Sequence, residues 1–150
     1  MIYLLDTNIL VRLANPQSPQ EPLARKSIRY LLEEGHTLVT GSQVIQEFFT
    51  VATRPLSARG GLGMSVPKVL EHISDFEEAV SLLSEVPLHN IWLRLVSKYE
   101  ISGVAAHDAR LAAFMIAHQI SHILTFNDKD FSRYAPEGII AVTPQSVFSN

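Results

Sequence analysis

The chain has 150 residues, of which 47% are hydrophobic and 18% are charged, a composition that excludes intrinsic disorder and allows a sizeable core. It contains no cysteine, which excludes a disulfide scaffold, a cysteine nucleophile and any thiolate metal site. Lys and Arg number 12 against 15 Asp and Glu, so the net charge is −3 and no global basic field is available to attract nucleic acid.

Short apolar runs alternate with segments of helical spacing in the N-terminal third of the sequence. Prolines separate the first two helical segments, and glycines bound the second apolar run. In chain order we expect a strand at 2–5, a short helix capped by Thr7 or Asn8, a helix from Leu23 to Gly35, a strand at 37–40, and a helix capped by Ser42 that ends near Thr53.

The same alternation continues to the C-terminus after an irregular, glycine-rich segment. The expected elements are a mobile loop at 54–63, helical spacing from Pro67 to Leu83 with a candidate break at Ser74-Asp75, a short strand at 85–88, a helix from His89 or Asn90 to Gly103, an apolar helix at 105–119, a strand at 122–125, a polar loop or short helix at 126–134 and a strand at 138–142.

Strands that alternate with helices predict a mainly parallel sheet covered on both faces, and hence one three-layer α/β/α domain spanning residues 1–150. The longest uninterrupted apolar run, 111–117, is far shorter than the roughly 18 residues of a membrane span, and no cationic leader is present, so we expect a soluble cytoplasmic protein. More large apolar side chains occur than we expect one small domain to bury, which predicts a homodimer; they are Phe48, Phe49, Trp92 and Phe114.

Three acidic residues lie at the ends of predicted elements or in apolar surroundings. Asp6 directly follows the first strand, where parallel sheets collect ligands, although an Asp there also serves as a helix cap. Asp108 is the only acid in the apolar helix, and it needs a partner unless the helix dipole alone stabilises it. Glu47 shares a polar row with Gln43, Thr50 and Arg54, and such a row taken alone is more often a solvated helix face.

Further polar residues, Asn127, Asp128 and Asp130, follow the strand at 122–125. An Asx turn explains such a stretch as well as a ligand site does. Acids at several strand and helix ends would meet at one edge of the sheet, and converging carboxylates repel unless a cation neutralises them. Mg²⁺ or Mn²⁺, which take oxygen ligands, would meet this requirement and serve the hydrolysis of a phosphodiester.

Other chemistries lack their motifs. The six histidines show no HExxH pairing, and the sequence contains neither GxxxxGK[ST] nor GxSxG. Arg54 and Arg59 are candidates for contact with a phosphate backbone, although an ordinary flexible connector is the simpler explanation of their loop.

Four short motifs, in their order and spacing, resemble the PIN-domain family, and within it the small VapC-type toxins of toxin–antitoxin pairs. They are Leu4-Leu5-Asp6-Thr7-Asn8, Gln46-Glu47-Phe48, His107-Asp108-Ala109 and Leu124-Thr125-Phe126-Asn127-Asp128-Lys129-Asp130-Phe131. The resemblance spans essentially the whole chain. It implies a PIN-fold ribonuclease in which Asp6, Glu47 and Asp108 hold Mg²⁺ or Mn²⁺, with Asp6 and Asp108 as the principal ligands.

The resemblance also implies roles for residues around these acids. Asn8 would donate hydrogen bonds to the acids or to bound water, and Thr125 and Asn127 would support the site. Many members place a fourth acid where this chain has Asn127, so either the adjacent Asp128 replaces it or three acids suffice. An asparagine cannot supply the missing charge, which predicts a weaker second metal site.

We therefore expect a metal-dependent endoribonuclease that acts on RNA and is restrained by a cognate antitoxin. The alternative is a catalytically silent PIN-like module that binds RNA or protein, a reading supported by Asn127. A phosphatase with Asp6 as its nucleophile is a third reading, but Asn8 stands where a second acid would be expected.

Overall fold

The centre of the structure is a parallel sheet of short strands. In this computed structural model, which describes residues 1–149, the strands are β1 (Ile2–Leu5), β2 (Thr37–Thr40), β3 (Ser81–Leu82), β4 (His122–Leu124) and β5 (Ile140–Val142). Their spatial order is β3-β2-β1-β4-β5, and every neighbouring pair is parallel. The central strand β1 is therefore covered on both faces, and its Leu4 and Leu5 are fully buried.

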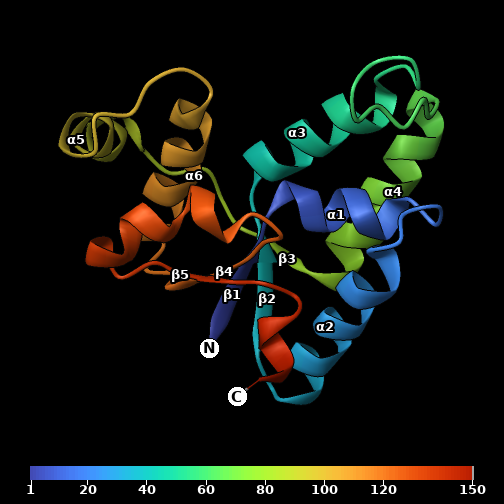
Figure 1. Cartoon of the computed structure of the whole chain (residues 1–150), viewed down its shortest axis with the longest axis horizontal. Helices are drawn as coiled ribbons and strands as arrows, with labels where there is room; N and C mark the ends of the chain where they lie inside the picture. Colours follow the sequence, from blue (N-terminus) through green and yellow to red (C-terminus); the bar gives the residue numbers. More distant parts are fainter. Residues whose placement is uncertain (150) are drawn as a thin grey trace.

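Helices cover both faces of the sheet, as the alternating pattern predicts. They are α1 (Thr7–Ala14), α2 (Glu21–Glu33), α3 (Ser42–Thr53), α4 (Val66–Ala79), α5 (His89–Lys98) and α6 (Ala105–Ala117). Three short 3-10 helices follow: η1 (Asp128–Asp130), η2 (Ser132–Glu137) and η3 (Ser146–Phe148). Figure 1 shows α5 and α6 to the left of the sheet, α1, α2 and α4 to its right, and α3 starting above it. The predicted α/β/α layering is confirmed.

Helix α6 is the most deeply packed helix around the sheet. Its buried residues are Ala109, Leu111, Ala112, Ala113, Phe114 and Met115. It packs between the sheet and α5, which explains why its apolar residues extend around most of its circumference. This packing fixes the helix that carries Asp108.

The strand expected at 85–88 is wrong. The edge strand of the sheet is Ser81–Leu82, and residues 83–88 are irregular. Leu83 still donates its N–H to the carbonyl of Thr40, but Pro87 has no N–H to continue a ladder. The preceding helix also differs from expectation: α4 runs past Ser74-Asp75 without a break and ends at Ala79.

Two expected helix caps are wrong as well. The side chain of Asp6, not of Thr7 or Asn8, caps α1, and Gly41 rather than Ser42 precedes α3. In both places the residue at the strand end keeps an extended backbone, and the helix begins one residue earlier than the polar pattern indicates.

The segment 54–63, expected to be a mobile loop, follows a defined path after α3. Backbone hydrogen bonds link Gly63 to Arg54 and Leu62 to Val51. A side chain at Gly61 would collide with the carbonyl oxygens of Pro55 and Arg54, so the turn requires glycine there.

The large apolar side chains that suggested a homodimer are mostly accommodated within one chain. Phe48 and Phe114 are buried in the core, and Phe49 and Trp92 are half-buried against it. The reason given for a dimer is thus wrong, and the dimer itself stays a prediction. No helix in the described part of the chain combines the length and apolar character needed to cross a membrane.

Candidate functional site

Asp6 lies at the carboxyl end of β1, in the middle of the sheet edge. It is 9% exposed. Its Oδ1 accepts a hydrogen bond from the backbone N–H of Thr7 (2.8 Å), and its Oδ2 accepts from the hydroxyl of Thr125 (2.7 Å) and from Nδ2 of Asn8 (3.1 Å). These three donors hold the carboxylate in one orientation.

Asn8 and Thr125 join the ends of β1 and β4. Nδ2 of Asn8 also donates to Oγ1 of Thr125 (3.1 Å), and Oδ1 of Asn8 accepts from the backbone of Phe126 (3.1 Å). Asn127 contributes its backbone N–H, which donates to the same Thr125 hydroxyl oxygen (3.0 Å). The structure thus brings the three predicted supporting residues together around Asp6.

Glu47 faces this network from α3. Its Oε2 accepts from the hydroxyl of Thr7 (2.9 Å), and its Oε1 accepts from Nε2 of Gln43 (2.9 Å) one turn earlier. Thr7 is therefore shared between two acids, since its N–H binds Asp6 and its hydroxyl binds Glu47. The polar row on α3 is part of the site rather than a solvated helix face.

Gln43 connects α3 to the first turn of α6, where Asp108 lies. Its Nε2 donates to the carbonyl oxygen of His107 (2.9 Å), and its Oε1 accepts from Nη1 of Arg110 (2.8 Å). Nη2 of Arg110 lies 3.6 Å from Glu85. The side-chain amide of Gln43 thus fixes the position of the α6 backbone next to Asp108 relative to Glu47 on α3.

Repulsion among carboxylates adds to the effect of burial on the pKa of two acids of the site. Burial raises the pKa of Asp6 to about 6; the charges of Glu47 and Asp130 add to this rise, and the hydrogen bonds from Thr125 and Thr7 oppose it. Burial also raises the pKa of Asp108 to about 6, with further rises from Asp130, Asp6 and Glu47. The acids therefore share one field, although they come from four separate segments of the chain.

Asp130, not Asp128, is the downstream acid whose charge acts on Asp6 and Asp108. The two acids belong to the 3-10 helix η1, in which successive residues are turned by about a third of a circle, so they point in different directions. A catalytic role for Asp128 stays a prediction, and the charge that Asp130 contributes at Asp6 and Asp108 makes it a second candidate for the fourth acid.

The structure adds Thr7, Gln43, Arg110 and Asp130 to the residues singled out from sequence. Gln43 had a signal, because it lies four residues before Glu47 on the same helix face. Thr7 lies next to Asp6, but only the fold reveals that its hydroxyl reaches α3. Arg110 carries no local signal, since its partner Gln43 is far away in sequence, whereas Asp130 had its place among the polar residues after the strand at 122–125.

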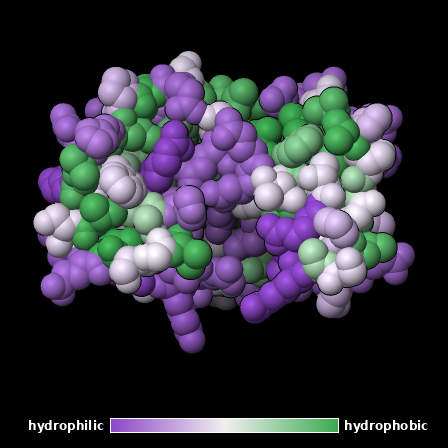
Figure 2. Space-filling view, turned by 90° about the horizontal axis from the view of Figure 1, so that it is seen from above, coloured by the Kyte–Doolittle hydropathy of each residue, from purple (hydrophilic) through white to green (hydrophobic). Residues whose placement is uncertain are grey.

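A groove of about 730 Å³ opens between α3 and α6, beside the acids. It is lined by Gln43, Gln46, Glu47, Thr50, His107, Asp108 and Arg110. Figure 2, which looks down on the molecule from the top of Figure 1, shows hydrophilic groups around the hollow between its two halves. The volume of the groove lies within the range of roughly 300–1,000 Å³ that is typical of ligand sites.

Arg54 and Arg59 lie beyond this groove, in the loop after α3. Arg54 is turned back on the loop, where its Nη1 donates to the carbonyl of Arg59 (3.0 Å). Arg59 is exposed. The structure does not bring either residue to the acids, and contact with substrate stays a prediction for both.

The donor set suits a hard divalent cation. All four acids offer oxygen ligands, and a positive charge among them would relieve the repulsion that raises the pKa of Asp6 and Asp108. Within residues 1–149, no three His, Cys, Asp or Glu side chains stand close enough together to hold a metal ion as they are. The donor chemistry fits a divalent cation, and binding would require the carboxylates to move closer together.

The PIN domain family model matches residues 3–136. No curated protein matches the chain at a significant level.

Three solved structures illustrate the likeness in fold. VapBC2 from Rickettsia felis, bound to a DNA fragment from its promoter, superposes with a TM-score of 0.66 at 22% identity over 95% of this chain and 98% of that one. VapC20 from Mycobacterium tuberculosis, a toxin that cleaves the sarcin–ricin loop, has a TM-score of 0.62 at 18% identity over 95% and 98%. VapBC-1 from nontypeable Haemophilus influenzae has a TM-score of 0.66 at 19% identity over 97% and 99%.

Proposed function

The chain belongs to the PIN domain family, and we propose that it is a divalent-metal-dependent endoribonuclease that hydrolyses phosphodiester bonds of RNA. The observation that carries this proposal is the hydrogen-bond network at the carboxyl edge of the sheet, in which Thr7 joins Asp6 to Glu47 and Gln43 joins Glu47 to the first turn of α6, where Asp108 lies. Four acids from separate segments would destabilise the fold for no gain unless a cation used them.

In this proposal Asp6 and Asp108 hold Mg²⁺ or Mn²⁺. When bound, the metal ion would supply a water of lowered pKa and stabilise the leaving oxyanion. Glu47, oriented by Thr7 and Gln43, keeps lone pairs free to orient the attacking water and accept its proton.

Asn8 and Thr125 act on Asp6 rather than on substrate. Their hydrogen bonds hold one oxygen of the Asp6 carboxylate in place, which fixes the orientation of the group that would bind the metal ion. Asp130 supplies the fourth charge in place of Asn127, whose backbone N–H supports Thr125. The missing acid at Asn127 therefore does not leave the site with only three carboxylates.

Cleavage of RNA by the purified protein in Mg²⁺ or Mn²⁺ tests the proposal. Asp6→Asn and Asp108→Asn are each expected to lower the rate by about 100-fold or more, because outer-shell changes alone cost about 10- to 100-fold at metal sites. Glu33→Gln, an exposed acid at the end of α2, is the matched control and should leave the rate unchanged. Undiminished activity in both Asp variants would refute the assignment.

Calorimetric titration with Mn²⁺ separates the enzyme from a catalytically silent module. An enzyme of this kind should bind Mn²⁺ with an affinity that Asp6→Asn and Asp108→Asn reduce. A silent module need not bind metal at these acids. Since VapC20 cleaves the sarcin–ricin loop, an RNA hairpin and an unpaired strand are the first two substrates to compare.

We also propose that a cognate antitoxin restrains the enzyme. The structures of VapBC2 and VapBC-1 support this, because their names describe toxin–antitoxin assemblies of the same fold. Co-expression with the product of an adjacent small gene should yield a stable complex with lower nuclease activity. A product that neither binds nor inhibits would count against it.

A homodimer would show a solution mass near twice 16.7 kDa.

A further inference from the structure

Beside the acid groove lies a second pocket of about 380 Å³, between α5 and the first turns of α6. Its lining comprises Val86, Leu88, His89, Trp92 and Arg110. Arg110 lines both this pocket and the groove beside the acids, so the two hollows share this residue. The pocket therefore begins two residues along α6 from Asp108.

We propose that this second pocket is a nucleobase subsite, which takes one unpaired base of the RNA while Arg110 contacts a neighbouring phosphate. The inference rests on the proposed nuclease function and adds to it that the substrate is unpaired at this point. Proteins that recognise single-stranded RNA stack its bases on aromatic side chains and on arginine planes. Trp92, His89 and Arg110 supply such groups in one hollow.

The indole of Trp92 is held in a fixed position. Its Nε1 donates to the carbonyl oxygen of Ala106 (2.9 Å), and its backbone N–H donates to Leu88. Ala106 lies two residues before Asp108, so the pocket wall is tied directly to the helix that carries the acid. A ring that is already fixed loses little conformational entropy when a base stacks on it.

The guanidinium of Arg110 is oriented but still available to a phosphate. Gln43 accepts one hydrogen bond from it, and its ion pair with Glu85 is long, at 3.6 Å. Both side chains of that pair are exposed, Arg110 to 41% and Glu85 to 58%, so the pair contributes little and a phosphate can replace the carboxylate. Arg110 is also the cation that both hollows share, which makes the junction complementary to a polyanion.

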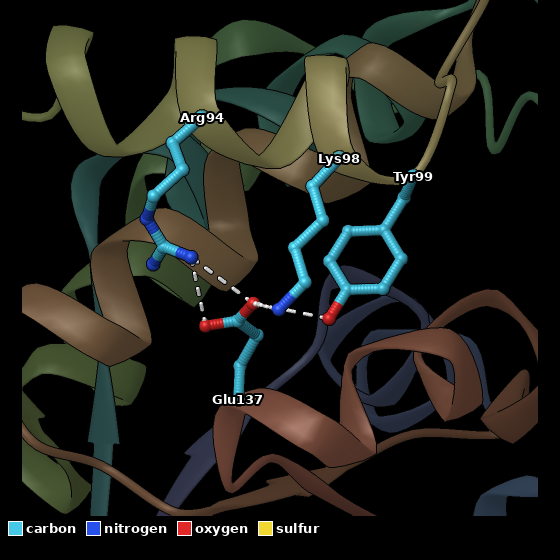
Figure 3. A network of polar contacts seen from close by, with 4 residues as sticks. All are labelled: Arg94, Lys98, Tyr99 and Glu137. Atoms are coloured by element: carbon cyan, nitrogen blue, oxygen red, sulfur yellow. Dashed lines mark hydrogen bonds and ion pairs between the residues drawn. The ribbon is translucent and has the colours of Figure 1, made fainter.

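The outer wall of the pocket is anchored as well. Figure 3 shows three side chains of α5 and its C-terminal end, Arg94, Lys98 and Tyr99, converging on Glu137 at the end of η2. Arg94 contacts both carboxylate oxygens (3.1 and 3.0 Å), and Lys98 and Tyr99 contact Oε1 (2.8 and 3.0 Å). Helix α5 is therefore held at Ala106 on one side and at Glu137 on the other, and the pocket exists before RNA arrives.

Trp92 is the single tryptophan of the chain, so tryptophan fluorescence, excited selectively over that of the four tyrosines, reports on this pocket. The wild-type chain is titrated in EDTA, which prevents cleavage, with an unpaired oligoribonucleotide, with the same strand annealed to its complement, and with ribose 5-phosphate. We expect saturable quenching by the unpaired strand and none by the duplex or the sugar phosphate. Quenching of equal size by all three would overturn the inference.

Arg110→Ala and His89→Ala are each expected to raise the dissociation constant for the unpaired strand by about tenfold. Arg110→Lys is expected to recover part of the lost affinity. Arg29→Ala, an exposed arginine on α2, is the matched control and should bind like wild type. Thermal unfolding of each variant checks that it is folded. Equal affinities in the folded Arg110→Ala and Arg29→Ala proteins would overturn the inference.

The two proposals fail separately. A chain that cleaves RNA in Mn²⁺ but shows no quenching in EDTA keeps the nuclease and loses the base subsite. A chain that shows quenching but no cleavage keeps the subsite and loses the nuclease.

Discussion

Without metal, the protein should become less stable as the pH rises from about 5 to about 7.5, and Asp6 should be the main cause. Burial raises the pKa of Asp6 from the ordinary value of 3.8 to about 6, so the folded state holds this proton more tightly than the unfolded state does. The resulting stability is complete below the ordinary value and is lost as the pH rises through about 6.

The size of the effect follows from the shift. About two pKa units correspond to about 3 kcal/mol in total, of which about 1.4 kcal/mol is lost between about pH 5 and about pH 7.5. In a domain of this length each kcal/mol moves Tm by about 2–4 °C, so Tm should fall by about 3–6 °C over that range. Asp108 shifts in the same direction but is half-exposed, and solvent screening makes its share smaller.

Thermal unfolding in EDTA, followed by circular dichroism across this pH range, measures the effect. Asp6→Asn should remove most of the fall, whereas Glu33→Gln should keep it. His122 changes stability in the opposite direction, because burial lowers its pKa, but it is common to all three proteins and cancels in the comparison. Added Mn²⁺ should raise Tm more at about pH 7.5 than at about pH 5. If the Tm of wild type and of Asp6→Asn fell equally over this pH range, the idea that the buried, charged Asp6 destabilises the fold would be refuted.

Three further predictions concern positioning and anchoring. Gln43→Leu cannot hold Glu47, so it should weaken Mn²⁺ binding and lower kcat by about 10- to 100-fold with little change in Tm. Calorimetry measures the Mn²⁺ affinity, and cleavage assays measure kcat. Unchanged kcat and Mn²⁺ affinity would argue against a positioning role for Gln43. Asp130→Asn should lower the cleavage rate more than Asp128→Asn does, and the reverse order would restore Asp128 as the fourth acid. Glu137→Ala should lower the free energy of urea unfolding by about 1–2 kcal/mol, because it removes hydrogen bonds to charged groups, and an unchanged urea midpoint would show that the cluster does not anchor α5.

Much of the fold follows from local patterns. The strand before Asp6 and the helix around Asp108 are marked by apolar spacing and by chain breaks that lie within a few residues. The two-residue strand β3 escaped prediction because an edge strand that short has no periodicity of its own and is defined by its partner, β2.

The site was only partly predictable for the same reason. Asp6 and Asp108 stand out because each interrupts an apolar pattern, whereas Glu47 lies in an ordinary polar row and was singled out by the resemblance to the PIN-domain motifs. The bond between Asp6 and Thr125 joins residues 119 positions apart, and the bond between Gln43 and Arg110 spans 67. Which downstream acid faces the site depends on a single turn of η1, and sequence spacing does not determine its direction.

The amide of Gln43 has both its nitrogen and its oxygen engaged by different neighbours. Reversing it would set oxygen against the Glu47 carboxylate and nitrogen against the Arg110 guanidinium, so one rotamer alone is tolerated. The length of the Gln43 side chain therefore sets the distance between α3 and α6. Among divergent relatives, residues 43, 47 and 110 should consequently change together or not at all, and an alignment in which they vary independently would contradict this coevolution.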